Sequence, residues 1–160
     1  MALVIIRKTV ARENNQSIGR YLRYDIQADK DSMFNTPPVF PIYMLGKVLK
    51  WMRDQGGVEA MERQAEDKAG ILYRAIDQSS GYYRCPVDVN SRSVMNVVFR
   101  LPTEDLEKTF LSGADAAGLL NLKGHRSVGG IRASIYNALP KEGVQALATF
   151  MSEFQSAHPA

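Results

Sequence analysis

The sequence predicts a mixed α/β protein whose C-terminal part is a small α+β domain, and three features of the chain carry this prediction. Apolar residues recur at helical spacing over 58–77 and again after Pro140. Two runs rich in β-branched and aromatic residues, 82–87 and 94–101, are typical of strands. The order helix, two strands, helix, strands, helix favours a sandwich in which the helices cover one face of a largely antiparallel sheet.

The N-terminal part of the chain carries a different pattern. The apolar run Leu3–Ile6 predicts a strand that is buried on both faces of a sheet. Residues 9–32 are polar and predict irregular structure, with a loop signal at 14–17.

Proline and glycine mark the boundaries of two predicted helices. Pro37 and Pro38 cannot lie inside a helix, because neither has an N–H group to donate. One helix is predicted from Pro41 to the pair Gly56-Gly57, and the next runs from Val58 to about Asp77.

The C-terminal part contains two more predicted helices. Thr103 is a candidate N-cap for a helix that ends near Ala117, and the apolar segment 119–122 predicts a short strand. The final helix begins at Pro140, and we expect His158 to be structural in its last turn. Its apolar stripe comprises Val144, Leu147, Phe150, Met151 and Phe154.

The composition excludes several classes of protein. Lys and Arg number 20 against 17 Asp and Glu, and these charges are scattered rather than clustered, which argues against nucleic-acid binding. The N-terminal apolar run is too short for a membrane span and has no basic leader. Cys85 is the only cysteine, so we expect no disulfide, no metal site and a reducing, cytoplasmic location.

The segment 123–137 is the strongest candidate for a binding site. It places His125, Arg126 and Arg132 around the pair Gly129-Gly130. Arginine offers a permanent charge and a planar fork of donors that matches carboxylate or phosphate oxygens, and glycine permits close approach of backbone and ligand. Alternation along an extended strand predicts that Arg126 and Arg132 share a face, although the glycines weaken this inference. The alternative is an ordinary pair of surface arginines with a hydrogen-bonded histidine.

A weaker candidate lies before the two prolines. Asn35 and Thr36 offer an amide, a hydroxyl and adjacent backbone donors in a rigid loop, which can hold a phosphate group. Such a loop is more often a simple turn.

Four segments together resemble the C-terminal half of the phosphoserine aminotransferase family. The segment 32–38, SMFNTPP, resembles the cofactor-phosphate loop of that family, and 124–138, GHRSVGGIRASIYNA, is similar to its C-terminal signature. The segment 92–99, RSVMNVVF, and 50–52, KWM, with its following glycine pair also match. The likeness extends from about residue 3 to residue 158.

The resemblance implies an aspartate-aminotransferase-like fold, with 1–60 as a remnant of the large domain and 61–160 as the small substrate domain. It implies pyridoxal phosphate in the complete homodimeric enzyme, and transfer of an amino group from glutamate to phosphohydroxypyruvate to give phosphoserine and oxoglutarate. By the same resemblance, Asn35 and Thr36 bind the cofactor phosphate in the partner subunit's site. His125 and Arg126 contact the substrate phosphate, and Arg132 holds the substrate carboxylate.

The resemblance also implies that the catalytic lysine lies outside this chain. In the family that lysine, which forms the Schiff base, precedes the strand that Leu3–Ile6 matches, and neither Lys8 nor Lys123 corresponds to it. We therefore expect no catalytic residue here and almost no transamination by the chain alone. The alternative is a non-catalytic module whose apolar N-terminal run and first helix dock onto a separate large-domain chain.

Overall fold

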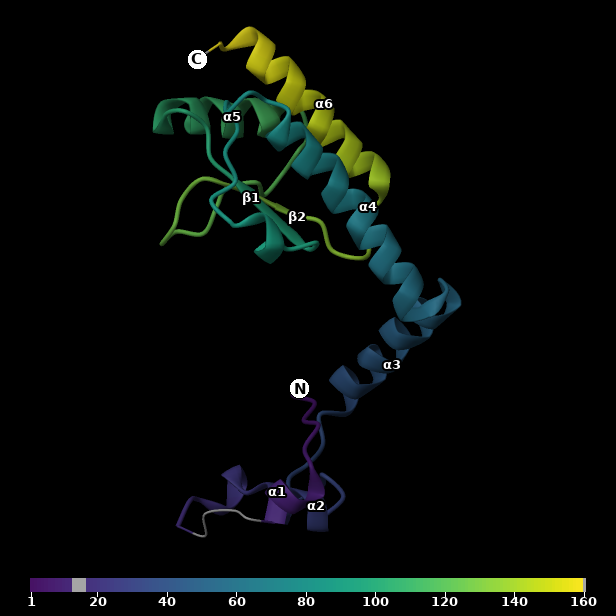
Figure 1. Cartoon of the computed structure of the whole chain (residues 1–160). Helices are drawn as coiled ribbons and strands as arrows, with labels where there is room; N and C mark the ends of the chain where they lie inside the picture. Colours follow the sequence, from purple (N-terminus) through teal and green to yellow (C-terminus); the bar gives the residue numbers. More distant parts are fainter. Residues whose placement is uncertain (13–16, 160) are drawn as a thin grey trace. The chain divides into compact units, whose positions relative to one another are not determined.

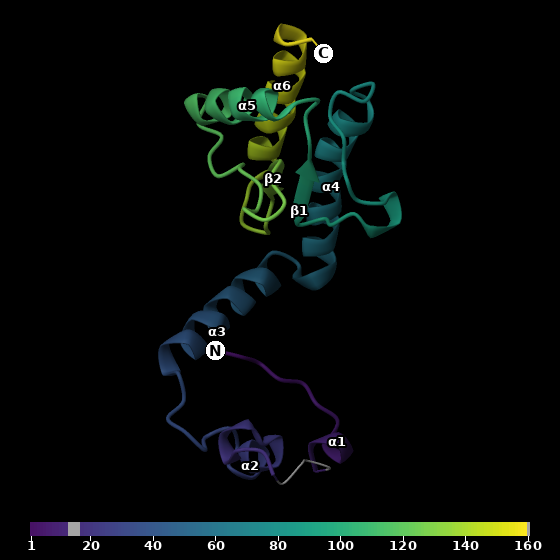
Figure 2. The ribbon, with the colours of Figure 1, turned by 90° about the vertical axis from the view of Figure 1, so that its left-hand side faces the viewer.

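The computed structural model describes residues 1–12 and 17–159. The chain forms two compact units, Met1–Asp54 and Gln55–Ala160, which are described in turn. Figures 1 and 2 show the elements of each unit from two directions.

The first unit is helical and exposes most of its apolar side chains. It contains α1 (Lys8–Arg12), the 3-10 helix η1 (Arg20–Leu22), α2 (Tyr24–Asp29) and α3 (Val39–Asp54). No residue of α3 is buried. The longest helix of this unit therefore has no buried face within the chain.

Two predictions for this unit are wrong. Leu3–Ile6 forms no strand, and Ile5 is 94% exposed, because no described segment offers the hydrogen-bonding neighbour that a strand requires. Short helices occupy parts of 9–32, where irregular structure was predicted. At the start of α2, the guanidinium of Arg23 donates to the Asp25 carboxylate (Nε to Oδ1, 3.1 Å). The loop prediction for 14–17 falls mainly on residues 13–16, which lie outside the described part.

The proline pair does lie outside a helix, as predicted. Pro37 and Pro38 precede α3, which begins at Val39, two residues before the predicted start at Pro41. A proline in the first turn is compatible with the helix, because the N–H groups there have no intrahelical acceptor.

The second unit packs three helices with a two-stranded sheet. The helices are α4 (Gly57–Asp77), α5 (Glu104–Ala116) and α6 (Lys141–Ala157), and α4 and α6 lie side by side (Figures 1 and 2). The strands are β1 (Asn96–Phe99) and β2 (Ile131–Ser134), with a 3-10 turn, η2 (Val89–Ser91), before β1. The predicted alternation of helices with antiparallel strands is confirmed, but one strand stands between successive helices where two or more were predicted.

The strand register separates a core face from an open face. The strands are antiparallel and pair Val97 with Ala133 and Phe99 with Ile131, and all four side chains are at most 2% exposed. Because side chains alternate along a strand, the remaining pairs point the other way. Those half-buried residues are Asn96, Val98, Arg132 and Ser134.

An aromatic cluster fills the space between the sheet and the helices. Phe110 of α5 is fully buried, and its ring meets Phe99 edge to face with centroids 5.8 Å apart. Tyr83 packs edge to face on Phe99 at 5.5 Å and donates its hydroxyl to the carbonyl of Met151 in α6 at 2.8 Å. Burial raises the pKa of Tyr83 well above its ordinary value, so the phenol stays a donor.

The helix ends follow the sequence closely. The Thr103 hydroxyl accepts a hydrogen bond from the Leu106 N–H at 3.2 Å, as an N-cap does. Gly118 follows α5 with φ of 79°, a left-handed conformation that glycine adopts without strain. At the far end of α6, the His158 ring stacks on Phe154 with centroids 4.2 Å apart, consistent with a structural role.

Two predicted strands are wrong. In 82–87 only Arg84 forms a bridge, to Arg100. Pro86 cannot donate a backbone hydrogen bond. The neighbouring Tyr82 and Tyr83 are both buried, whereas side chains alternate between the two faces of a strand. The segment 119–122 forms no strand, because Asn121 has a φ of 62°, which ends an extended run.

Candidate functional site

The segment 124–130, which we call the anion loop, is closed at its base by backbone hydrogen bonds. Lys123 bridges Ile131, and the Gly124 N–H donates to the Gly130 carbonyl at 2.8 Å. Inside the loop, the N–H groups of Val128 and Gly129 donate to the His125 carbonyl at 2.9 and 2.8 Å. The loop therefore folds on itself, and it extends away from α4 and α6 in Figure 1.

Two glycines are required by this geometry. A Cβ atom on Gly124 would lie 2.0 Å from the Gly129 carbonyl oxygen, so no larger residue fits there. Gly130 has a φ of 71°, and its Cβ would lie 2.6 Å from Cδ of Arg100. The sequence pattern of glycines around arginines thus reflects a backbone that crosses itself closely.

The loop displays His125 and Arg126 to solvent. The Ser127 N–H donates to Nδ1 of His125 at 3.3 Å, and the Ser127 hydroxyl lies 2.7 Å from the same nitrogen. With Nδ1 accepting from a backbone N–H, the neutral ring carries its proton on Nε2, which leaves that N–H free to donate outward. Arg126 is exposed, and its side chain has no hydrogen-bonding partner among the described residues.

Arg132 lies on the open face of the sheet, in the centre of β2. Its Nε is buried and has no hydrogen-bond partner in the described part of the chain. Its main-chain N–H donates to the Leu122 carbonyl at 2.7 Å, which fixes the strand on which it stands. A half-buried guanidinium with an unmet donor suits an anionic ligand, because an unsatisfied buried donor is costly.

Polar groups surround Arg132 on the same face. Asn96 stands on β1 across from Ser134, and its Oδ1 accepts from the Ser134 hydroxyl at 3.1 Å and from the Tyr136 hydroxyl at 3.4 Å. Sequence reasoning missed Asn96, although the alternation along β1 would have placed it on this face.

Sequence reasoning also missed an ion pair beneath the loop. Arg100 donates from Nη1 to the Val128 carbonyl at 2.9 Å, and its Nε lies 2.7 Å from Oε1 of Glu107. Glu107 is 7% exposed and also accepts from the Leu101 N–H at 3.3 Å. No spacing in the sequence indicated this pair, because its members meet the loop only through the fold.

The structure brings three of the five predicted site residues into one unit. His125 and Arg126 lie on the anion loop and Arg132 on the strand that follows it, in the second unit. The expectation that Arg126 and Arg132 share a strand face is wrong, because residues 126–128 form a turn and no strand alternation applies there.

The other two predicted residues belong to the first unit. Asn35 and Thr36 are exposed in the connection between α2 and α3, held rigid by the following prolines. No described residue occupies either side chain by a hydrogen bond, so the amide and the hydroxyl are available to a ligand.

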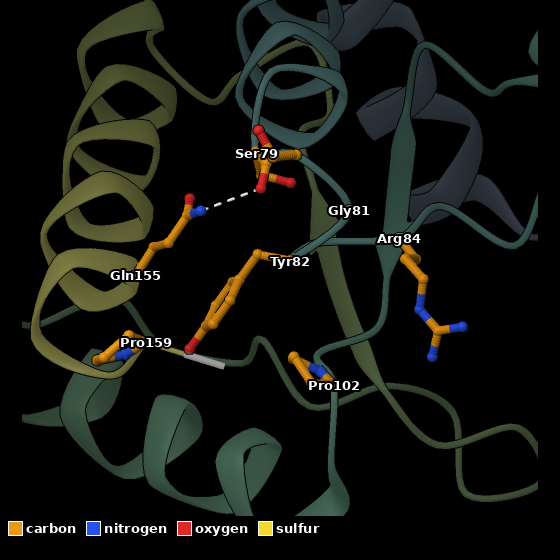
Figure 3. A pocket seen from close by; sticks show the side chains of 8 residues that line it. Ser79, Gly81, Tyr82, Arg84, Pro102, Gln155 and Pro159 are labelled. Atoms are coloured by element: carbon orange, nitrogen blue, oxygen red, sulfur yellow. Dashed lines mark hydrogen bonds between the residues drawn. The ribbon is translucent and has the colours of Figure 1, made fainter.

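A pocket of about 500 Å³ in the second unit contains none of the predicted residues. Residues 79–82 line it together with Arg84, Pro102, Gln155 and Pro159. Gln155 donates to the Ser79 carbonyl at 3.0 Å across it, and the Arg84 guanidinium extends away from Tyr82 and Gln155 (Figure 3). With its one arginine pointing outward, this pocket does not present converging donors to an anion.

Neither a membrane span nor a metal cluster is found in the described residues. None of the helices over 1–12 and 17–159 is both long and apolar enough to cross a bilayer. No group of three or more His, Cys, Asp or Glu side chains gathers there as metal ligands would.

Comparison with known proteins decides the family. The sequence profile of the class-V aminotransferases matches residues 7–147. The chain belongs to this family. As a class-V aminotransferase chain it is 56% identical over 158 residues to a phosphoserine aminotransferase of Laribacter hongkongensis and 52% identical to that of Lysinibacillus sphaericus. Each alignment covers 99% of this chain and 44% of the relative, so the chain spans less than half the length of these proteins.

Solved structures of class-V aminotransferases agree with this assignment. The chain matches phosphoserine aminotransferase from Bacillus circulans subsp. alkalophilus with a TM-score of 0.90 and 48% identity, over 95% of this chain and 42% of that one. It matches the pyridoxal-phosphate-bound phosphoserine aminotransferase of Trichomonas vaginalis with a TM-score of 0.79 and 37% identity, over 86% and 39%. The aminotransferase fold inferred from the sequence resemblance is confirmed.

Proposed function

We propose that this chain is the substrate-binding part of a phosphoserine aminotransferase, an enzyme that moves an amino group from glutamate to phosphohydroxypyruvate in serine biosynthesis. The observation that carries the proposal is that one unit holds both the exposed donors of the anion loop and a half-buried arginine. His125 and Arg126 project from the anion loop, and Arg132 stands on the adjoining strand. We assign residues 1–60, which include the whole first unit, to the large domain and 61–160 to the small domain, in a cytoplasmic homodimer.

The donors of the anion loop and the Arg132 guanidinium suit the two anionic ends of phosphoserine. A phosphate dianion is best held by several donors, and the His125 Nε2–H with the Arg126 fork supplies them. A carboxylate matches the planar donors of one arginine, and Arg132 has an unmet Nε donor to offer. Discrimination against serine or alanine then follows, because those molecules leave the phosphate donors without a partner.

Asn35 and Thr36 fit the phosphate of pyridoxal phosphate. Their exposed amide and hydroxyl are unoccupied by described residues, and the two prolines hold the loop rigid. When bound, this cofactor supplies the electron sink for chemistry at the substrate α-carbon. Our proposal gives these two residues the task of anchoring the phosphate in the site of the partner subunit, while Arg132 orients the substrate by its carboxylate.

Titration of the full chain with O-phosphoserine and with serine, followed by amide chemical shifts, tests the proposal. Arg126→Gln is expected to lose roughly tenfold in affinity for phosphoserine and little for serine, whereas Arg132→Gln weakens both ligands. Arg63→Gln is the matched control, since it removes the same charge from an exposed position on α4. Equal affinity of the wild type for serine and phosphoserine would overturn the assignment of the loop.

Activity of the chain alone is tested separately. We expect it to show almost no transamination, because more than half the length of its relatives has no counterpart in these residues. The chain is mixed with pyridoxal phosphate, reduced with borohydride and digested. Covalent label on a lysine of this chain, together with turnover of phosphoserine, would contradict that expectation.

A second candidate is a non-catalytic module that docks onto a separate large-domain polypeptide. The apolar side chains of the first unit favour it: Leu3 is 78% exposed, Ile5 94% and Phe40 71%. Light scattering of the chain alone is expected to show association, which the variant Ile5→Lys/Phe40→Lys reduces. If the wild-type chain were a monodisperse monomer with the same mass as this variant, that result would count against docking.

A further inference from the structure

Arg100 connects three parts of the second unit that are distant in sequence. It follows β1, and its main chain exchanges hydrogen bonds with Arg84, at 2.9 and 3.0 Å. Its guanidinium reaches Glu107 of α5 with Nε at 2.7 Å and the Val128 carbonyl with Nη1 at 2.9 Å. One side chain therefore ties the anion loop to a helix of the core.

The loop backbone is shaped to receive this side chain. A Cβ on Gly130 would lie 2.6 Å from Cδ of Arg100, and a Cβ on Gly129 would lie 3.3 Å from its Nη1. Because Gly129 and Gly130 have no side chains, they leave the space that the Arg100 side chain occupies beside the loop. Glu107, being buried, holds the guanidinium there with a charge-assisted bond.

The hydrogen bond that the Val128 carbonyl accepts from Arg100 restrains the turn that carries His125 and Arg126. The Val128 N–H donates to the His125 carbonyl, so fixing Val128 also fixes the turn that displays His125 and Arg126. In the described part of the chain, Arg100 is the one side chain from outside 124–130 that hydrogen-bonds to this loop.

We propose that Arg100, held by Glu107, is a positioning residue that keeps the anion loop in its binding shape before the ligand arrives. This inference rests on the proposed function, since it assigns the loop its phosphate ligand. A loop that is already ordered does not have to lose that freedom on binding, so its affinity for the anion is higher.

The experiment measures loop order and anion binding on the same full-length variants. Arg100→Lys keeps the charge but cannot hold Glu107 and Val128 with one planar group. We expect amide hydrogen exchange at Val128 and Gly129 to quicken about tenfold or more while exchange at Val97 in the core strand is unchanged. Affinity for O-phosphoserine is expected to fall by roughly tenfold, because binding must then supply the free energy that orders the loop.

Arg92→Lys is the matched control. Arg92, like Arg100, pairs with a carboxylate and makes two hydrogen bonds, in its case to both oxygens of Asp77 at 2.7 Å, but it has no described contact with the loop. It is expected to leave loop exchange and phosphoserine affinity unchanged. Should Arg100→Lys fail to fold, Glu107→Gln serves, because it weakens the hold on Arg100 while preserving shape, and it too should quicken exchange at Val128 and Gly129.

The outcomes separate this inference from the proposed function. Wild-type exchange rates at Val128 and Gly129 in Arg100→Lys or Glu107→Gln would overturn the positioning role. So would undiminished phosphoserine affinity of those variants when the wild type binds. If the wild type binds no phosphoserine, the proposed function fails, while the exchange rates still decide whether Arg100 orders the loop.

Discussion

Replacing Gly124 with alanine should open the base of the anion loop. The new Cβ would lie 2.0 Å from the Gly129 carbonyl oxygen and 2.7 Å from that of Gly130, and both are backbone atoms that no side-chain rotation can move away. The Gly124 N–H to Gly130 carbonyl bond, 2.8 Å long, must therefore lengthen or break. We expect this loop closure to be disrupted before the pairing of β1 with β2, because the clash lies outside the two strands.

The magnitude follows from two costs. Losing one backbone hydrogen bond costs about 1 kcal/mol. Forcing an extra methyl group into a packed site costs about 1–3 kcal/mol. We expect the free energy of unfolding to fall by about 2–4 kcal/mol, which is the sum of the two costs.

Urea unfolding followed by far-ultraviolet circular dichroism measures this change. The matched control is Gly143→Ala in α6, where the new Cβ would make an ordinary 3.5 Å contact with Leu139 and improve helix propensity. It should be neutral or slightly stabilising. A Gly124→Ala protein that lost less than about 0.5 kcal/mol would refute the steric reasoning, because that is the size of an unremarkable surface change.

Three other changes test the second unit. Phe110→Ala should cost about 3–5 kcal/mol of unfolding free energy in urea, because the ring is fully buried among other aromatic rings. Thr103→Ala should cost about 1 kcal/mol in the same assay, because it removes the N-cap of α5. Lys68 donates to the carbonyls of Tyr136 and Leu139 at 2.7 and 3.0 Å, and burial lowers its pKa. The folded state then loses this proton at a lower pH than the unfolded chain, so the stability of the wild type relative to Lys68→Met should rise as pH increases toward 10.5, the ordinary value.

Each of these has a control and a contradictory result. Leu120→Ala, at a 61% exposed position, should change stability by less than about 0.5 kcal/mol, and a similar value for Phe110→Ala would contradict its burial. Thr109→Ala, within α5, should not reproduce the loss seen at the cap. A difference between wild type and Lys68→Met that is flat from pH 7 to pH 10 would contradict a lowered pKa.

The helices of the second unit were predictable because their signals are local. The apolar spacing of α4 and the N-cap of α5 depend on neighbours within a few positions, and both were placed within a residue or two. Arg132 could be singled out as a candidate from residue type, because two arginines beside glycines indicate anion binding without any knowledge of the fold, and its role stays a prediction.

The errors arise where tertiary partners decide. Leu3–Ile6 has strand composition, but hydrogen bonding along a strand requires a neighbour that composition does not supply. Tyr82 and Tyr83 suit a strand, yet both were drawn into the aromatic core instead. The sequence did not indicate the Arg100–Glu107 pair. Its contact with the anion loop depends on where β1 ends relative to a segment that begins more than twenty positions later.

The two-residue period of the sheet also limits how this part of the gene can change in length. Inserting or deleting one codon within β2 would turn Arg132 toward Phe110 and the other core rings, and would turn Ala133 out to the open face. Such a change would bury the charge of Arg132 and remove the side chain for which we propose a carboxylate ligand, so it should destabilise the fold. Length variation should therefore accumulate in connections such as 117–122, while the count of residues from Gly130 to Ser134 stays constant.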